Sequence, residues 1–353
     1  MAGIFGLFDY TKEGPGVYPD DPPKGAFGTF FSVLGRKFWK IVTINLMYVV
    51  FSLPVFLIAF FGASFVIQAF VPGMTPQVLA DIFKDAGIIL QEDITFLDFA
   101  NLQFLQMYVL VAVTLVGLGL AIIGPVHAGV VYLLRNYARE EHAFVWMDFK
   151  DHARNNLRQS LATSAISFLL TLLFVINYSF YNTNMVLNSP LISVFLQTLI
   201  VVFFVIWCMM QLYLYPMMVT FKLTVKQLLR NSLMFAILRL PLNIGILLLS
   251  VLILFAIPGV LLLLGYGISV LAAMLWYLFF ALAFNLFMTT FFAYRGLDKH
   301  MIQRIKAAEA PEQAEQAVEE DWEDDEDEAE EETEKEAGEA AEPGLSRSPY
   351  GSR

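Results

Sequence analysis

Residues 240–294 read LPLNIGILLLSVLILFAIPGVLLLLGYGISVLAAMLWYLFFALAFNLFMTTFFAY, a run without a single Asp, Glu, Lys or Arg. A helix needs about 20 apolar residues to cross the roughly 30 Å hydrocarbon layer of a bilayer. The run is long enough for two crossings, with a break at Gly265-Tyr266-Gly267. Because lipid cannot satisfy backbone polar groups and no alternating strand pattern is present, the run predicts two membrane helices.

Three further runs lack charged residues, over 41–80, 99–134 and 159–221. The first two can each hold one crossing, and the third can hold two, separated by the polar segment 182–190. Together the four runs predict an all-α, polytopic membrane bundle. We expect six transmembrane helices, at about 41–66, 105–134, 160–181, 191–215, 242–264 and 268–294.

The composition of the 353-residue chain agrees with a membrane protein. Its residues are 58% hydrophobic and only 16% charged, whereas a soluble domain is about a quarter charged. The net charge of −11 combines a mildly basic body, +5 over residues 1–306, with −16 over residues 307–353. This pattern excludes a soluble enzyme, and the single cysteine, Cys208, excludes a framework of internal disulfides.

Lys and Arg are distributed unequally between the two sides of the predicted bundle. Eighteen of them lie in the segments 1–40, 135–158, 222–239 and 295–306, and the loops on the other side carry only Lys84. Basic residues collect on the cytoplasmic side of a membrane. We therefore predict a multi-pass protein of the bacterial cytoplasmic (inner) membrane with both termini in the cytoplasm.

The same pattern divides the chain into a cytoplasmic N-terminal segment, a transmembrane domain and a cytoplasmic acidic tail, over 1–40, 41–294 and 295–353. In the transmembrane domain we expect an external loop over 67–104, with a short amphipathic helix at the outer interface. Cytoplasmic connectors are expected over 135–158 and 220–240. The acids of the tail repel one another, which predicts a disordered, solvated segment.

Ionisable side chains inside a membrane are usually functional, and the six predicted spans contain no Asp, Glu, Lys or Arg. This disfavours a proton- or sodium-coupled pump and is compatible with a path for a neutral solute. The side chains that we expect to line such a path are amides: Asn45, Gln211, Asn243 and Asn285, with Asn177 and Gln197 as further members. The alternative is that these amides join helices by hydrogen bonds.

The second predicted helix carries small residues at a spacing of three and four, namely Thr114, Gly117, Ala121, Gly124 and Ala128. Such a face lets helix backbones approach closely. Pro125 lacks a backbone donor and predicts a kink, with His127 just beyond it. The pattern predicts either tight packing or a hinge, formed by Gly117, Ala121, Gly124, Pro125 and His127.

Patterns typical of catalysis, metal binding or nucleic-acid binding are missing from the sequence. His142 and His152 are ten residues apart, and the acids around them do not have the spacing of metal ligands. We therefore expect no enzymatic activity, no cofactor, no metal and no nucleic-acid partner. A membrane enzyme is the remote alternative, and its only cluster of acids and bases is Glu140, His142, Asp148 and His152.

The two predicted connectors share the pattern K-x-x-x-R-N-x-L, beginning at Lys150 and at Lys226. The match indicates either a parallel repeat of two helix pairs or similar basic starts of two membrane helices. We expect the connectors to contact anionic lipid or a protein partner through Arg139, Glu140, Trp146, Asp148, Phe149, Arg154, Asn155, Lys226, Arg230 and Asn231. Glu140 and Asp148 are expected to form ion pairs with Arg135 and Arg139.

Residues 124–149, GPVHAGVVYLLRNYAREEHAFVWMDF, resemble the signature of the YesL-like family of bacterial membrane proteins of unknown function. Asn45-Leu46 followed by Ser52-Leu53-Pro54-Val55 is similar to the opening of that family. Residues 214–217, LYPM, and 223–231, LTVKQLLRN, are similar to its second cytoplasmic segment. The long external loop and the acidic tail depart from the family pattern. The resemblance implies a link to carbohydrate import and implies no mechanism.

These observations predict a non-enzymatic integral membrane protein that is accessory to a membrane transport system, or modulates one, with carbohydrate uptake as the implied context. Its partners would be the lipid bilayer and an importer permease or ATPase. The alternative is a transporter or channel for an uncharged small solute, built on the amides and the kinked second helix.

Overall fold

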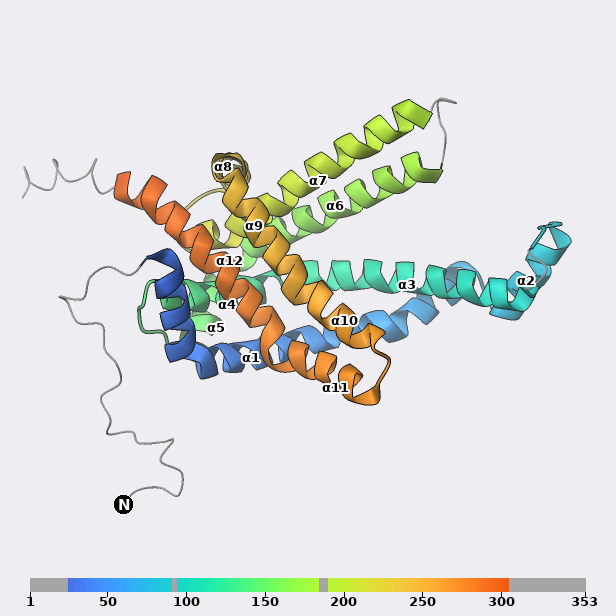
Figure 1. Ribbon diagram of the computed structural model, residues 1–353, viewed down its shortest axis with the longest axis horizontal. Coiled ribbons are helices and arrows are strands. Elements are labelled where there is room, and N and C mark those ends of the chain that lie inside the picture. Colours follow the sequence, from blue (N-terminus) through green and yellow to red (C-terminus); the bar gives the residue numbers. More distant parts are fainter. Residues whose placement is uncertain (1–24, 91–93, 184–189, 305–353) are drawn as a thin grey trace, which may run out of the picture. The chain divides into compact units, whose positions relative to one another are not determined.

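The computed structural model describes residues 25–90, 94–183 and 190–304. Every regular element in those ranges is helical (Figure 1). In chain order the elements are α1 (Ala26–Phe70), α2 (Pro76–Asp85), α3 (Phe96–Ile122), α4 (Gly124–Ala138), α5 (Val145–Asn155), α6 (Leu157–Thr183), α7 (Pro190–Met218), α8 (Val225–Leu238), α9 (Leu240–Val251), η1 (Leu252–Ala256), α10 (Ile257–Leu263), α11 (Gly267–Trp276), η2 (Tyr277–Ala281), α12 (Leu282–Leu297) and η3 (Asp298–Ile302).

Six helical stretches of the described chain are long and apolar enough to cross a membrane, which confirms the predicted fold class. They cover Ala26–Phe70, Phe96–Ile122, Leu157–Tyr181, Leu191–Met218, Leu240–Leu263 and Gly267–Ile302. Their outer surfaces are apolar: Phe65, Val113 and Leu248 are 76%, 62% and 64% exposed. Large exposed apolar surfaces of this kind are typical of helices that face lipid.

The chain divides into two units, Met1–Tyr294 and Arg295–Arg353. The first holds the helical bundle from α1 to most of α12. In the second, the described residues continue as helix, and Gln303 donates a hydrogen bond to Asp298 Oδ2 at 3.0 Å. Most of the predicted N-terminal segment and acidic tail lies outside the described residues.

Helix α1 is longer than a single crossing. Its 45 residues, at about 1.5 Å per residue, follow a path of about 68 Å, which bends near its start (Figure 1), against roughly 30 Å of hydrocarbon. The first turns carry Arg36, Lys37 and Lys40, and the following residues are apolar. The charged part therefore belongs outside the hydrocarbon layer, and the residues from Ile41 onward are the ones suited to cross it.

The second predicted helix, 105–134, is two helices in the structure. Helix α3 ends at Ile122 and α4 begins at Gly124, with Pro125 in the first turn of α4. Proline has no backbone N–H, so the hydrogen-bond ladder cannot run through this point unbroken. His127 N instead bonds to Ile123 O at 3.1 Å and starts the new helix.

The connectors contain short helices with their own caps. In α8, the Thr224 hydroxyl accepts from Gln227 N, and Gln227 Oε1 accepts from Thr224 N at 2.8 Å, which is a reciprocal capping box. Helix α2, in the predicted external loop, is capped by Thr75 and has proline in its first turn. These caps satisfy backbone donors that would otherwise lack partners at helix starts.

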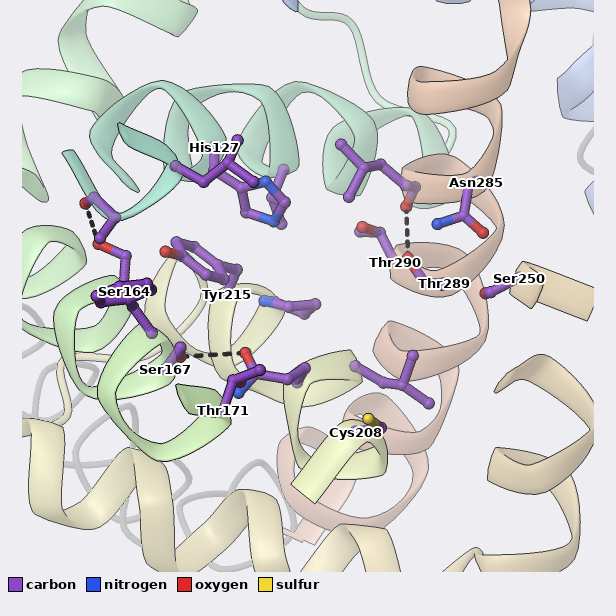
Figure 2. Close-up of a pocket in the computed structure, with 18 of the residues that line it drawn as sticks. His127, Ser164, Ser167, Thr171, Cys208, Tyr215, Ser250, Asn285, Thr289 and Thr290 are labelled. Carbon is purple, nitrogen blue, oxygen red and sulfur yellow. Dashed lines mark hydrogen bonds between the residues drawn. The ribbon is translucent and has the colours of Figure 1, made fainter. Parts of the chain in front are cut away.

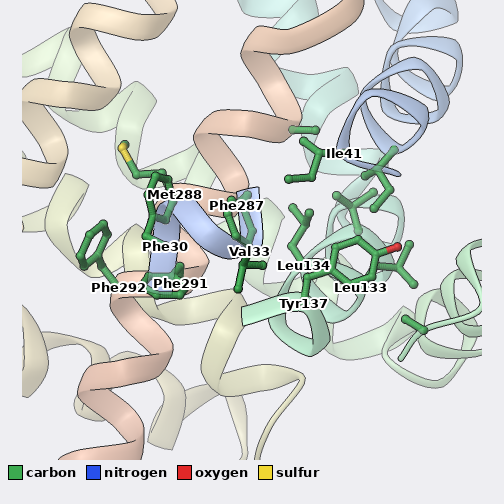
Figure 3. Packing of buried hydrophobic residues seen from close by; sticks show 14 of the residues in the cluster. Phe30, Val33, Ile41, Leu133, Leu134, Tyr137, Phe287, Met288, Phe291 and Phe292 are labelled. Carbon is green, nitrogen blue, oxygen red and sulfur yellow. The ribbon is translucent and has the colours of Figure 1, made fainter. Parts of the chain in front are cut away.

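The buried core joins α1, α4 and α12 (Figure 3). Phe30 stacks on Phe287 with ring centroids 5.3 Å apart and also contacts Phe291. Ile41 and Leu134 are fully buried in the same cluster. These contacts hold α12 against α1, and both helices reach the cavity described next.

Candidate functional site

A cavity of about 550 Å³, partly open to its surroundings, lies between helices of the bundle (Figure 2). Its volume falls within the range of small-molecule binding sites. The walls come from α1, α3, α4, α6, α7, α9 and α12. The lining residues are Tyr48, Gly117, Leu120, Ala121, His127, Val131, Ser164, Ser167, Phe168, Thr171, Cys208, Gln211, Leu212, Tyr215, Pro216, Leu247, Ser250, Asn285, Leu286, Thr289 and Thr290.

The cavity lining is mainly apolar and carries uncharged polar groups. Among the described residues, none that lines it is Asp, Glu, Lys or Arg. Three lining residues have a buried side-chain atom without a hydrogen-bond partner: Gln211 Nε2, Ser250 Oγ and Asn285 Oδ1. Nearly all buried polar atoms in proteins are hydrogen-bonded. Three such atoms on residues of one cavity wall give that wall hydrogen-bonding capacity that no other group of the described chain uses.

The orientation of the Gln211 amide is set by a neighbouring helix. Its Oε1 accepts a hydrogen bond from Ser167 Oγ of α6 at 3.2 Å (Figure 2). One turn away, Trp207 Nε1 donates to Thr171 Oγ1 at 3.3 Å and again joins α7 to α6. Gln211 Nε2 is buried and has no hydrogen-bond partner, so the NH₂ group is the unused part of this amide.

Three aromatic or imidazole rings form the part of the wall nearest α4. Tyr48 Oη and His127 Nδ1 are 3.1 Å apart, and the rings of His127 and Tyr215 meet edge to face with centroids 4.3 Å apart. The three residues come from α1, α4 and α7. The hydrogen bond with Tyr48 and the ring contact with Tyr215 therefore fix the His127 side chain from two sides.

The stripe of small residues packs α3 and α4 against α6. A Cβ atom on Gly124 would lie 2.7 Å from Ser160 O, and one on Gly117 would lie 2.7 Å from the Phe168 ring. Ala121 O accepts a hydrogen bond from Ser164 Oγ at 2.5 Å. These residues hold the α3 and α4 backbones against the α6 face that lines the cavity.

The four amides predicted to line a solute path separate into two pairs. Gln211 and Asn285 lie in the cavity wall. Asn243 instead donates to Phe235 O and Ala236 O at 3.0 Å and accepts from Tyr213 Oη at 2.7 Å. Asn45 bonds only to backbone groups of α12 and η2. The second pair has the helix-joining role that was the alternative.

The other two amides also bond to backbone. Asn177 Nδ2 donates to Leu173 O of its own helix at 2.7 Å, and Gln197 Nε2 donates to Tyr181 O of α6 at 2.8 Å. Neither residue lines the cavity.

Several lining residues were not singled out from the sequence, although a signal was present. On α6, Ser164, Ser167 and Thr171 follow one another at intervals of three and four, which places them on one helix face. On α12, Thr289 follows Asn285 by one turn. Serine and threonine are frequent in membrane helices as packing residues, so this signal has low specificity.

The residues predicted as a docking surface are only partly accessible. Trp146 is 61% exposed, and Arg154, Asn155, Lys226 and Arg230 are also exposed. Phe149 is 4% exposed, because it packs against Gly129 and into the core. Asn231 has intermediate exposure.

The ion pairs expected in the first connector are wrong. Glu140 pairs with Arg36 of α1, and Arg139 pairs with Glu141 at 2.7 Å. Asp148 Oδ2 accepts from Phe144 N at 2.8 Å, ahead of α5. Arg135 is buried and donates to Val219 O at 2.5 Å. The expectation failed because partners distant in the chain compete with nearby ones.

The acids and bases of the remote enzyme alternative have other contacts. The His152 ring stacks on Tyr132 with centroids 3.2 Å apart and an interplanar angle of 14°. Burial, aided by the nearby Arg135 charge, lowers the pKa of His152. His142 contacts the Phe144 ring. In the part of the chain that the structure describes, no group of three or more His, Cys, Asp or Glu is arranged to hold a metal ion.

A model of the family described as "Protein of unknown function, DUF624" matches residues 104–178. The match includes all of α4 and α5 and most of α3 and α6, and therefore part of the cavity wall. It supports a relation to an uncharacterised family, and the YesL-like assignment stays a prediction. Neither a curated protein nor a solved structure matches the chain.

Proposed function

We propose that this multi-pass membrane protein binds an uncharged polar solute in the cavity of its helical bundle and acts as a transporter or channel for it. The observation that carries this proposal is the set of three unpaired polar atoms around one cavity, Gln211 Nε2, Ser250 Oγ and Asn285 Oδ1. Together they offer a donor, a hydroxyl and an acceptor. All three atoms are buried in the wall, so small side-chain movements would bring them to a solute that both donates and accepts hydrogen bonds.

The solute is proposed to be neutral because the described lining offers it no counter-charge. An ion taken from water into an apolar interior is strongly disfavoured unless it is paired. The apolar walls, including Phe168, Leu212 and Leu247, would contact the carbon skeleton of the solute. Among the described residues, the lining also holds no carboxylate that could couple movement to protons or sodium, which favours passive movement and a non-enzymatic role.

We place the protein in a bacterial cytoplasmic membrane with the α5 and α8 connectors facing the cytoplasm. The support for this orientation is the charge distribution: 18 basic residues flank the spans on one side, and only Lys84 lies on the other. Under this orientation the break between α3 and α4 lies nearer the cytoplasmic side.

The native cysteine provides a direct test, because Cys208 is the only cysteine of the chain and it lines the cavity. Purified protein would be labelled with methyl methanethiosulfonate, a small neutral thiol reagent, with and without glycerol, glucose or urea. We expect at least one of these neutral probes to slow the labelling and to cross proteoliposomes that contain the protein. Glutamate and lysine should do neither.

Asn285→Leu should abolish the protection of Cys208 and the solute flux. Asn177→Leu is the matched control, since its amide bonds only to its own helix, and it should retain both. The proposal is wrong if none of the three neutral probes protects Cys208, or if Asn285→Leu protects as well as the unmodified protein.

A second candidate function is the accessory one, and the exposed face of α5 favours it. Trp146 is 61% exposed, Phe144 and Met147 are also exposed, and Arg154 adds positive charge. An importer permease or ATPase is the proposed partner of this face. Crosslinking in native membranes should capture that partner with the unmodified chain and fail with Trp146→Ala, Arg154→Glu. Capture that is unchanged in the double variant would refute this role.

A further inference from the structure

The last two membrane stretches each contain a π-helical segment. Segment η1, Leu252–Ala256, separates α9 from α10, and η2, Tyr277–Ala281, separates α11 from α12. A π turn is wider than an α turn, is rare, and is found frequently at functional sites. The two segments are linked, because Trp276 Nε1 donates to Ile253 O at 2.9 Å and Tyr277 Oη donates to Leu254 O.

Asn45 completes the hydrogen bonds around η2. Its Nδ2 donates to Tyr277 O at 2.9 Å and to Leu278 O at 2.7 Å, and its Oδ1 accepts from Ala283 N at 2.8 Å. Asn45 is fully buried in α1. An amide inserted into a helix ladder in this way stabilises an irregular turn, since it replaces hydrogen bonds that the widened backbone does not make.

Both irregular segments adjoin residues of the cavity wall that carry buried, unpaired atoms. Ser250 precedes the first residue of η1 by two positions, and Asn285 follows the last residue of η2 by four. Each residue of an α-helix turns the chain by about 100°. If a π turn were replaced by an α turn, the neighbouring cavity residue would rotate by about that angle and leave the wall.

We propose that Asn45 and Trp276 are positioning residues for the solute site: Asn45 holds η2 so that Asn285 faces the cavity, and Trp276 holds η1 so that Ser250 does. This proposal rests on the proposed function, because it concerns the same cavity. In this proposal Asn45 acts through Asn285 and does not contact the solute. This role replaces the prediction that Asn45 lines the solute path.

The test measures which way each helix faces. In a Cys208→Ser background, Asn285→Cys and Ser250→Cys each provide one thiol as a reporter, and native Cys208 is a third reporter in the unmodified chain. Each would be combined with Asn45→Leu or with Trp276→Phe and labelled with methyl methanethiosulfonate. Intact-protein mass spectrometry gives the labelling rates, and gel filtration verifies folding.

Asn45→Leu should slow labelling at position 285 by at least about tenfold, because the thiol would face the cavity in only a minor population. Labelling of Cys208 on α7 should stay within about twofold, since it does not contact η2. Trp276→Phe should slow labelling at position 250 and leave position 285 unchanged. Trp276→Phe also keeps the proposal testable if Asn45→Leu does not fold.

Asn243→Leu is the matched control, because Asn243 is an equally buried amide that bonds to α8 instead of a π segment. It should lower stability without changing labelling at position 285. If Asn45→Leu slowed the labelling of positions 208, 250 and 285 equally, the cavity as a whole would have collapsed and the proposal would be overturned. Unchanged labelling at position 285 would also overturn it. Because labelling needs no solute, failure of the flux test would contradict the proposed function alone.

Discussion

Gln211, Ser250 and Asn285 resemble the other polar residues of the membrane helices until their hydrogen bonds are compared. Asn243 uses both ends of its amide, whereas Asn285 Oδ1 is buried without a partner. An unpaired buried acceptor destabilises a protein unless a ligand or water satisfies it. We therefore expect the cavity residues to bind the solute and to lower the free energy of unfolding of the empty protein. The helix-joining amides are expected to raise that free energy.

This contrast predicts opposite effects of one substitution at two positions. Asn285→Leu should leave the free energy of unfolding unchanged or raise it by up to about 1 kcal/mol, because it removes an unpaired acceptor. Asn243→Leu should lower it by about 1–3 kcal/mol, because two carbonyls and the Tyr213 hydroxyl lose a partner. Thermal unfolding in detergent would measure both, and equal destabilisation would contradict the distinction.

The close approach of α4 to α6 predicts that Gly124 does not tolerate a side chain. Gly124→Ala should destabilise the fold by about 1–3 kcal/mol, since its Cβ would lie 2.7 Å from the Ser160 carbonyl oxygen. Gly35→Ala is the control: no atom lies within 4 Å of its Cβ position, and alanine favours the helix by up to about 1 kcal/mol. Thermal unfolding of the two variants should therefore shift in opposite directions.

Helix α5 is held to α4 by stacking as well as by apolar burial. The ring of His152 lies on Tyr132, with Arg135, Asp148 and Asp151 as the charged groups around it. Phe149 meanwhile packs against the backbone at Gly129. Burial and the Arg135 charge outweigh the two acids and lower the pKa of His152 below its ordinary 6.5.

A lowered histidine pKa makes the contact between α5 and α4 sensitive to acid. The folded state binds the proton less readily than the unfolded state, so the contribution of His152 to stability is present above about pH 6.5 and is lost as the pH falls from there through its folded pKa. His152→Gln should therefore lose less thermal stability between about pH 7.5 and about pH 5 than the unmodified protein. An identical loss in both proteins would show that His152 has no part in it.

The described helical bundle combines an apolar lipid-facing surface, a core at α1, α4 and α12, and a cavity whose lining has no Asp, Glu, Lys or Arg. The unequal distribution of Lys and Arg between the two sides of the bundle predicts its orientation in the membrane. In a Cys208→Ser background, the cysteine of Lys84→Cys should react with a membrane-impermeant maleimide in spheroplasts, in which the outer envelope has been removed and the cytoplasmic membrane is intact. A cysteine at Arg154 should react only after lysis, and the reverse pattern would invert the proposed orientation.

The six membrane stretches could be predicted from the sequence because the length of an apolar run is a local property, and lipid permits few backbone structures other than helices. The break at Gly124-Pro125 was equally local, since proline lacks the donor that a continuous ladder needs. The helix bounds were less predictable. Helix α1 begins at Ala26 and not near residue 41, because helices continue beyond the hydrocarbon layer.

The roles of the amides were decided by the tertiary structure. Asn45 and Asn285 look alike in sequence, but Asn45 bonds to backbone groups more than 230 residues away, and Asn285 faces a cavity. The π segments η1 and η2 and the ion pair between Arg36 and Glu140 likewise depend on neighbours from distant helices. Apolar runs and charge bias are read along the chain, whereas a hydrogen-bond partner is known only once the helices have packed.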